Sequence, residues 1–386
     1  MPKNLLKRIQ HFNFTTMIKP IRLFLFILVW VALPEITKAK IDSTWRTSPS
    51  VNLNGFIDVF YAYDFPAPAA SFRQPYLFNH NRHNEVNINM ALIKLAVTHP
   101  KYRANIALHA GTYATDNYAA EPRWIQNIFE ANAGIALDEK NKLWLDGGIF
   151  GSHIGFEGAV STDNWTLTRS LLAENSPYFL AGAKLNYRHN PQLEMALIVC
   201  NGWQRIQPVS GNSIPALGTQ LKYTPNANLT FNWSTFIGTD DPDSTRRWQF
   251  FNNLYAQLNL GKKLGVIAGF DVGMQQRRKG SKEQEVWYSP VVIVRYAVKE
   301  SLALALRGEY YSDAQHIIIG AVNGEPFKTS GVSLNVDYRP VDLVTCRLEG
   351  KWLNSRAPIF RQGNGWVNNN FSVIASIALN ITKQIK

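Results

Sequence analysis

The sequence predicts an all-β fold, a transmembrane antiparallel up-and-down β-barrel of about 16 strands with short periplasmic turns and long extracellular loops. Three observations predict it. Apolar and polar side chains alternate along many segments, short and long connections alternate between these segments, and the only long apolar run lies near the N-terminus. Strands expose successive side chains on opposite faces, and only helices or closed barrels satisfy every backbone group in lipid.

The N-terminal region has the pattern of a secretory signal over residues 1–39, with Met17 as an alternative start. Lys19 and Arg22 precede the apolar run LFLFILVWVAL, which has 11 residues and is too short to span a bilayer as a helix. A short periplasmic segment, 40–50, is expected next, and then a single barrel domain over 51–386. Sixteen strands are expected at 51–63, 84–98, 102–113, 125–137, 142–150, 178–188, 192–204, 216–224, 228–238, 247–259, 263–275, 285–298, 301–312, 330–338, 342–353 and 370–382.

The connections support the barrel. Tight turns, such as HPK at 99–101 and KE at 299–300, alternate strictly with long polar stretches. Membrane barrels with short turns at the periplasmic end and long loops at the extracellular end show this alternation. The segment SLALALRGEYY shows the expected faces: Leu302, Leu304 and Leu306 should face lipid, and Arg307 and Glu309 should line water. A phase shift near Ala91 predicts a β-bulge.

The net charge and the cysteine content argue against a nucleic-acid-binding protein and against a disulfide-bonded fold. The formal net charge is +12 and falls to +7 without the leader, and the excess is dispersed, which argues against a nucleic-acid partner. Cys200 and Cys346 fall on strands eight apart and are expected to be free thiols. Outer-membrane lipid, small hydrophilic solutes and the barrel-insertion machinery are the expected partners, homo-oligomers are allowed, and no cofactor is expected.

Three stretches carry a family resemblance: GFIDVFYAYD at 55–64, the segment from LWLDGGIFGSHIGFEG to AGAKLNY at 143–187, and VCNGW at 199–203. Together they resemble the OmpL-like β-barrel porin family, best over residues 51–205. The resemblance implies a channel of the Gram-negative cell outer membrane.

The longest loop, 151–177, supplies the first candidate site. By likeness to general porins it folds inward and narrows the channel; otherwise it covers the barrel from outside. Asp163 could cap a helix over WTLTRSLLAE. The constriction candidates are His153, Glu157, Asp163, Arg169 and Glu174.

The alternation along the strands places equal numbers of basic and acidic residues in the lumen. This balance of charge predicts weak charge selectivity. For any single one of these residues, an equally good alternative is that it pairs with a neighbouring charge and only stabilises the barrel wall. The pore-lining candidates are Arg103, Lys184, Arg188, Lys222, Arg295, Arg307, Arg347, Lys351, Asp58, Glu130, Asp146, Glu194, Asp271, Glu309, Asp337 and Glu349.

No catalytic or metal site is predicted. The glycines of DGGIFGSHIGFEG lack the ending of a phosphate loop, and His80 and His83 are expected to be a solvated pair without a third ligand. The favoured function is passive diffusion of small hydrophilic solutes. The alternatives are an outer-membrane barrel hydrolase and a secreted β-sandwich that binds glycans.

Overall fold

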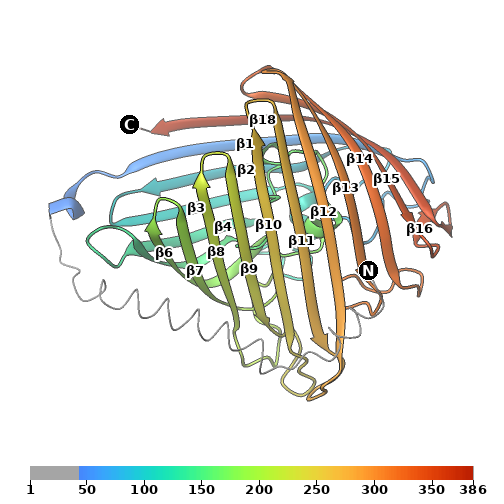
Figure 1. The fold of residues 1–386 in the computed structure, drawn as a ribbon, viewed down its shortest axis with the longest axis horizontal. Coiled ribbons are helices and arrows are strands. Elements are labelled where there is room, and N and C mark those ends of the chain that lie inside the picture. Colours follow the sequence, from blue (N-terminus) through green and yellow to red (C-terminus); the bar gives the residue numbers. More distant parts are fainter. Residues whose placement is uncertain (1–42, 386) are drawn as a thin grey trace.

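The computed structural model describes residues 43–385, so the predicted signal sequence lies outside the described residues. Sixteen antiparallel strands follow one another around a closed barrel, and the first strand pairs with the last (Figure 1). The barrel strands are β1 (Ser50–Asp64), β2 (Val86–Thr98), β3 (Tyr102–Ala110), β4 (Ile128–Ala136), β5 (Leu143–Gly151), β6 (Phe179–Asn190), β7 (Leu193–Cys200), β8 (Ala216–Asn226), β9 (Leu229–Gly238), β10 (Gln249–Leu260), β11 (Leu264–Gln276), β12 (Gln284–Lys299), β13 (Leu302–Asp313), β14 (Phe327–Val341), β15 (Val344–Ser355) and β18 (Asn369–Ile385).

Other elements are short. The helical segments are η1 (Ser43–Arg46), α3 (Thr112–Asn117), η2 (Ser161–Asp163) and α4 (Leu171–Glu174), and the small hairpin in the last long loop is β16 (Phe360–Gln362) with β17 (Gly365–Val367). Within the described residues, no helix has the length and apolarity needed to cross a bilayer.

The predicted alternation of connections is confirmed. Turns as short as 191–192 and 300–301 join strands at one end of the barrel, and the long loops join them at the other. The longest loop covers 152–178, one residue later than predicted. The expected bulge lies at Asn89, because Asp58 pairs with Met90 while the next residue, Val59, pairs with Ile88.

Side-chain directions also follow the prediction. On β13, Leu306 is 52% exposed on the outer surface, whereas Arg307 and Glu309 point inward and are covered. Outer residues of a membrane barrel meet lipid and inner residues enclose the lumen. Cys200 on β7 and Cys346 on β15 are both free.

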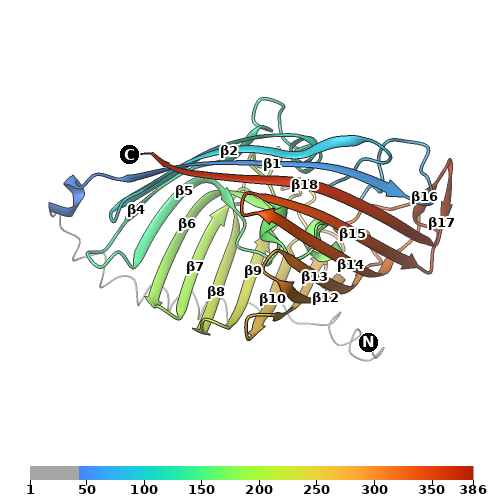
Figure 2. The ribbon, with the colours of Figure 1, turned by 90° about the horizontal axis from the view of Figure 1, so that it is seen from above.

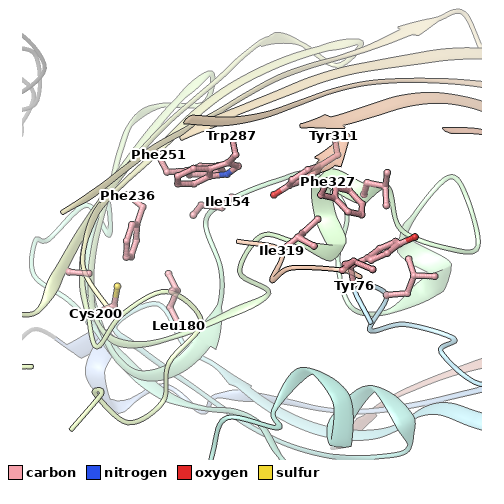
Figure 3. Packing of buried hydrophobic residues seen from close by; sticks show 14 of the residues in the cluster. Tyr76, Ile154, Leu180, Cys200, Phe236, Phe251, Trp287, Tyr311, Ile319 and Phe327 are labelled. Atoms are coloured by element: carbon pink, nitrogen blue, oxygen red, sulfur yellow. The ribbon is translucent and has the colours of Figure 1, made fainter. Parts of the chain in front are cut away.

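The interior is not an open tube, because several long loops turn into it (Figure 2). A hydrophobic cluster fills part of its extracellular half, near the ends of the strands that carry long loops. Figure 3 shows Ile154 beside Phe251 and Trp287, and shows Tyr76 near Phe327. Three of these aromatic residues come from barrel strands, while Tyr76 and Ile154 come from loops. The cluster therefore joins loops to the inner wall.

Candidate functional site

The loop 152–178 lies inside the barrel, which decides between the two alternatives for it. Its ends meet, since the Ser152 backbone N donates to the Tyr178 carbonyl at 2.9 Å. Between these ends the loop contacts strands on distant parts of the wall: Nε2 of His153 lies 2.9 Å from the Thr235 carbonyl on β9, and the Thr168 backbone N donates to Glu349 on β15 at 2.6 Å. We call residues 152–178 the inserted loop.

Glycines on the inner wall make room for the aromatic side chains of the inserted loop. A Cβ built on Gly265 would lie 2.5 Å from the ring of Trp165, and one on Gly269 would lie 2.5 Å from the ring of Phe156. Both distances are far below van der Waals contact. Larger residues at these two positions on β11 would therefore push the inserted loop away from the wall.

Charged residues on β13 and β15 hold the inserted loop. Arg307 is fully buried, and its guanidinium lies 2.7 Å from Glu349 and donates to the Thr168 carbonyl at 2.7 Å. Lys351 lies 3.0 Å from Glu309, whose carboxylate also accepts from the inserted loop. Because each buried charge has an opposite charge beside it, the cluster is a stable anchor that would be costly to break.

A second group of contacts between the inserted loop and the barrel lies closer to the periplasmic side. Arg347 pairs with Asp337 at 2.7 Å and donates to the Ser161 and Asn164 carbonyls at 2.5 and 3.1 Å. We call the inner face of β13, β14 and β15 the covered wall. The expectation that residues here line water is wrong for six candidates, which are buried on the covered wall: Arg307, Glu309, Asp337, Arg347, Glu349 and Lys351.

Four of the five constriction candidates serve mainly to fold the inserted loop and anchor it. Glu157 accepts from the Ser170 backbone N at 3.1 Å, and Arg169 donates to carbonyls of its own loop. Burial raises the pKa of Glu157 and of Glu174, and it lowers the pKa of His153 to about 4.

Asp163 is the constriction candidate that faces open space. It lies in the short turn η2 and lines a cavity, rather than capping a long helix. The predicted helix is wrong: only Leu171–Glu174 is helical, and Ser170 caps it by accepting from the Ala173 backbone N at 3.2 Å. The Ser170 hydroxyl oxygen accepts from a first-turn N–H that has no partner inside the helix, so the helix begins directly after Ser170.

Loop 65–85 also turns inward, which the sequence did not reveal. Arg73 lies 2.7 Å from Asp64, and Nε2 of His80 lies 2.9 Å from Asp58; all four residues are buried. The expected solvated pair is therefore wrong for His80. Burial lowers the pKa of His80, and the carboxylate of Asp58 opposes this change.

The opposite part of the lumen, on β2 to β7, stays open. A cavity of about 700 Å³ lies at the periplasmic end, and a second of about 680 Å³ runs between the inserted loop and β1, β2, β4 and β18. Lys94, Glu130, Gly151 and Ser152 line both cavities, so the two meet. We call the first cavity the vestibule and the face of β2 to β7 that lines it the open wall.

Charges of both signs line the vestibule. Lys94 lies 2.7 Å from Glu130, and Arg103 lies 2.5 Å from Asp146. The ammonium of Lys184 sits over the ring of Phe150, 4.9 Å from its centroid. Such a lining keeps water and ions in the cavity.

The remaining candidates have ordinary surroundings. Arg188 pairs with Glu194 at 2.8 Å and both are largely exposed at the periplasmic rim. Lys222 and Arg295 are half-buried on the inner face, and Asp271 is buried and accepts from Asn253 at 2.6 Å. Across residues 43–385, no group of three His, Cys, Asp or Glu residues could hold a metal ion.

A family model described as "Putative beta-barrel porin-2, OmpL-like" matches residues 50–381. The chain belongs to this family. No match was found among curated proteins. Its place in the family makes the chain an outer-membrane porin, and the closed barrel with a water-accessible cavity inside agrees with a passive diffusion channel.

Solved outer-membrane barrels share the fold. An anion-selective porin from Comamonas acidovorans superposes with a TM-score of 0.58 and 12% identity over 86% of this chain and 100% of its own. The channel DcaP of Acinetobacter baumannii gives 0.56 and 13% over 89% and 100%. Salmonella typhi OmpF gives 0.55 and 11% over 86% and 97%. At these identities the likeness concerns the fold alone.

Proposed function

We propose that small hydrophilic solutes cross this porin beside the inserted loop, through the vestibule and the second cavity. The observation that carries the proposal is that the two cavities meet at Lys94, Glu130, Gly151 and Ser152, between the inserted loop and the open wall. The loop would then set the size limit, with Asp163 facing the solute. The buried candidates His153, Glu157, Arg169 and Glu174 would act by holding the loop in place.

The charge of the vestibule supports a weak preference for anions. Its lining has five basic residues (Lys94, Arg103, Lys142, Lys184, Arg188) and three acidic ones (Glu130, Asp146, Glu194). Most of these charges are paired, so the excess is small and the selectivity should be modest. The structurally similar porin from Comamonas acidovorans is described as anion-selective.

The site supports transport rather than catalysis. Among the buried histidines of the described chain, His109 and His153 bind the carbonyls of Gln126 and Thr235, each at 2.9 Å, and His80 contacts Asp58. His99 does lie 2.7 Å from the hydroxyl of Thr47, but its Nδ1 accepts from the Lys101 backbone N, so no carboxylate orients it as a catalytic base. A serine hydrolase needs a histidine that contacts the nucleophilic hydroxyl. Homo-oligomers and recognition by the barrel-insertion machinery are further parts of the proposal.

Conductance of the detergent-purified chain in a planar bilayer tests the proposal. We expect discrete steps of conductance. In a KCl gradient, the sign of the reversal potential should show a modest preference for chloride over potassium. Replacing Lys184 by Glu should move the reversal potential toward cations and leave the folded barrel intact. Absence of steps from a folded, heat-modifiable sample would refute the proposal. An unchanged reversal potential in the Lys184→Glu variant would refute the assigned path through the vestibule.

A further inference from the structure

A polar groove of about 450 Å³ lies on the outer surface of the barrel, at the end where the long loops emerge. It crosses β12, β13, β14 and β15. Its polar and aromatic lining consists of Tyr288, Tyr310, Gln315, Lys328, Asn354 and Arg356, with Ser312 and Ser330 between them. We call it the rim groove.

Strand register brings these residues into one row. Tyr288 pairs with Ser312, which pairs with Lys328 on the next strand. Ser330 pairs with both Tyr310 and Asn354. The strand residues in the row have even numbers, whereas Trp287, Tyr311 and Leu353 have odd numbers and belong to the cluster inside the lumen. The row therefore faces the membrane side and not the channel.

The rim groove begins where the apolar outer surface ends. Below Lys328 on β14, the outward residues Val332 and Leu334 are 48% and 54% exposed, and on β15 the outward Trp352 is 45% exposed. Residues of this kind lie in the hydrocarbon layer, with aromatic side chains toward its edge. Lys328 and Arg356 thus lie at the height of the lipid headgroups.

The cations of the rim groove have no counter-charge in the described part of the chain. No ion pair there involves Lys328 or Arg356, both of which are exposed, and no acidic residue lines the groove. The nearby carboxylate of Asp313 turns inward, where it accepts from the backbone of Ile317 and Ile318. An external anion can therefore reach both cations.

The rim groove differs in polarity and charge from the outer surface beside it. On β10 and β11 the residues at the same end, Phe250 and Met274, form an apolar cluster with Val286, which borders the groove, and this cluster contains no cation. Adjacent tyrosines flank the groove instead, with the Tyr288 and Tyr310 ring centroids 6.0 Å apart. A ligand with an anionic group, hydroxyl groups and an apolar part would match this combination.

We propose that the rim groove binds the phosphorylated headgroup of an outer-leaflet lipid. Lys328 and Arg356 contact the phosphate, the tyrosine rings pack against the sugar or glycerol portion, and the acyl chains lie on the apolar surface below. Basic residues beside a bilayer bind anionic headgroups in this manner. A lipid source is favoured over free phosphate because the groove opens directly onto the hydrocarbon-facing surface.

Binding of lipid A, a phosphorylated diglucosamine lipid, to the purified full-length barrel in detergent tests the inference. The wild-type chain should bind diphosphorylated lipid A and bind the dephosphorylated lipid at least about tenfold more weakly, since each cation contributes to headgroup affinity. The double variant Lys328→Gln with Arg356→Gln should lose about tenfold or more. The variant Lys328→Arg with Arg356→Lys should retain binding.

The matched control removes two exposed cations from other extracellular loops, Arg123→Gln with Arg278→Gln, and should bind as wild type. Folding of each variant is checked by heat-modifiable migration, and channel conductance should not change. Equal binding by wild type and by the Lys328→Gln, Arg356→Gln variant would overturn the inference. Inorganic pyrophosphate that binds as tightly as lipid A would also overturn it, because the lipid portion would then contribute nothing.

Discussion

The two walls of the lumen carry the same kinds of charged residue in the same alternating pattern, yet they differ in what they face. On the covered wall, Arg307 and Glu349 are fully buried beneath the inserted loop. On the open wall, Arg103 pairs with Asp146 beside the vestibule and remains 37% exposed. Alternation thus decides which residues point inward, while the packing of a distant loop decides which of them meet water.

Removing Arg307 should produce the largest effect, because it leaves the buried carboxylate of Glu349 without its partner and removes the hydrogen bonds to Thr168. We expect Arg307→Met to lower the free energy of unfolding by about 3–5 kcal/mol and to release the inserted loop. Urea unfolding and protease cleavage within 152–178 measure both effects.

Arg103→Gln on the open wall is the matched control. Since its ion pair is partly solvated, the loss should be about 0–1 kcal/mol. Equal losses at Arg307 and Arg103 would contradict the distinction between the walls.

Acidification should weaken the anchor at His153. Its pKa in the folded protein is about 4, below the usual 6.5, so protonation favours the released loop. Stability is unaffected above pH 6.5 and falls as the pH drops toward 4, by on the order of 3 kcal/mol. The measurement is the difference in unfolding free energy between wild type and His153→Gln at several pH values.

The difference removes the contributions of Glu157 and Glu174, whose raised pKa values act in the opposite direction. A difference that stays constant between pH 7 and pH 4 would show that His153 is not buried as described.

Filling the space that a wall glycine leaves for the inserted loop should have a smaller effect. Gly269→Leu places a side chain where the ring of Phe156 lies, and we expect a loss of about 1–3 kcal/mol with increased channel conductance. Gly308→Leu is the control, since nothing lies within 4 Å of a Cβ there and the position faces outward. If the Gly308 variant disturbed conductance as strongly, displacement of the loop would not be the cause.

Local sequence patterns predicted much of the fold. Strand positions, the lengths of connections and the bulge near Ala91 depend on neighbouring residues, so period-2 alternation was sufficient to find them. The inward orientation of Arg307 followed for the same reason. Its burial could not be predicted, because it depends on Thr166 and Thr168, more than a hundred residues away in the chain.

Loop conformations were the part that the sequence left undetermined. The helix expected after Asp163 is largely absent because the segment bonds to β14 and β15, as the Leu167 backbone N does to Asn335. The burial of His80 likewise depends on Asp58, on a strand that precedes its loop. Glycines at 265 and 269 were a usable signal, since small residues on an inner wall mark a close approach.

The most direct test of the inserted loop as the channel's constriction is single-channel conductance after its removal. Residues 154–176 can be replaced by a short Gly-Ser turn, since Ser152 and Tyr178 already meet at 2.9 Å. Shortening the exposed loop 277–283 serves as the control. We predict a severalfold larger conductance for the first variant and no change for the second. Equal conductance for wild type and the loop-deleted barrel would contradict the account.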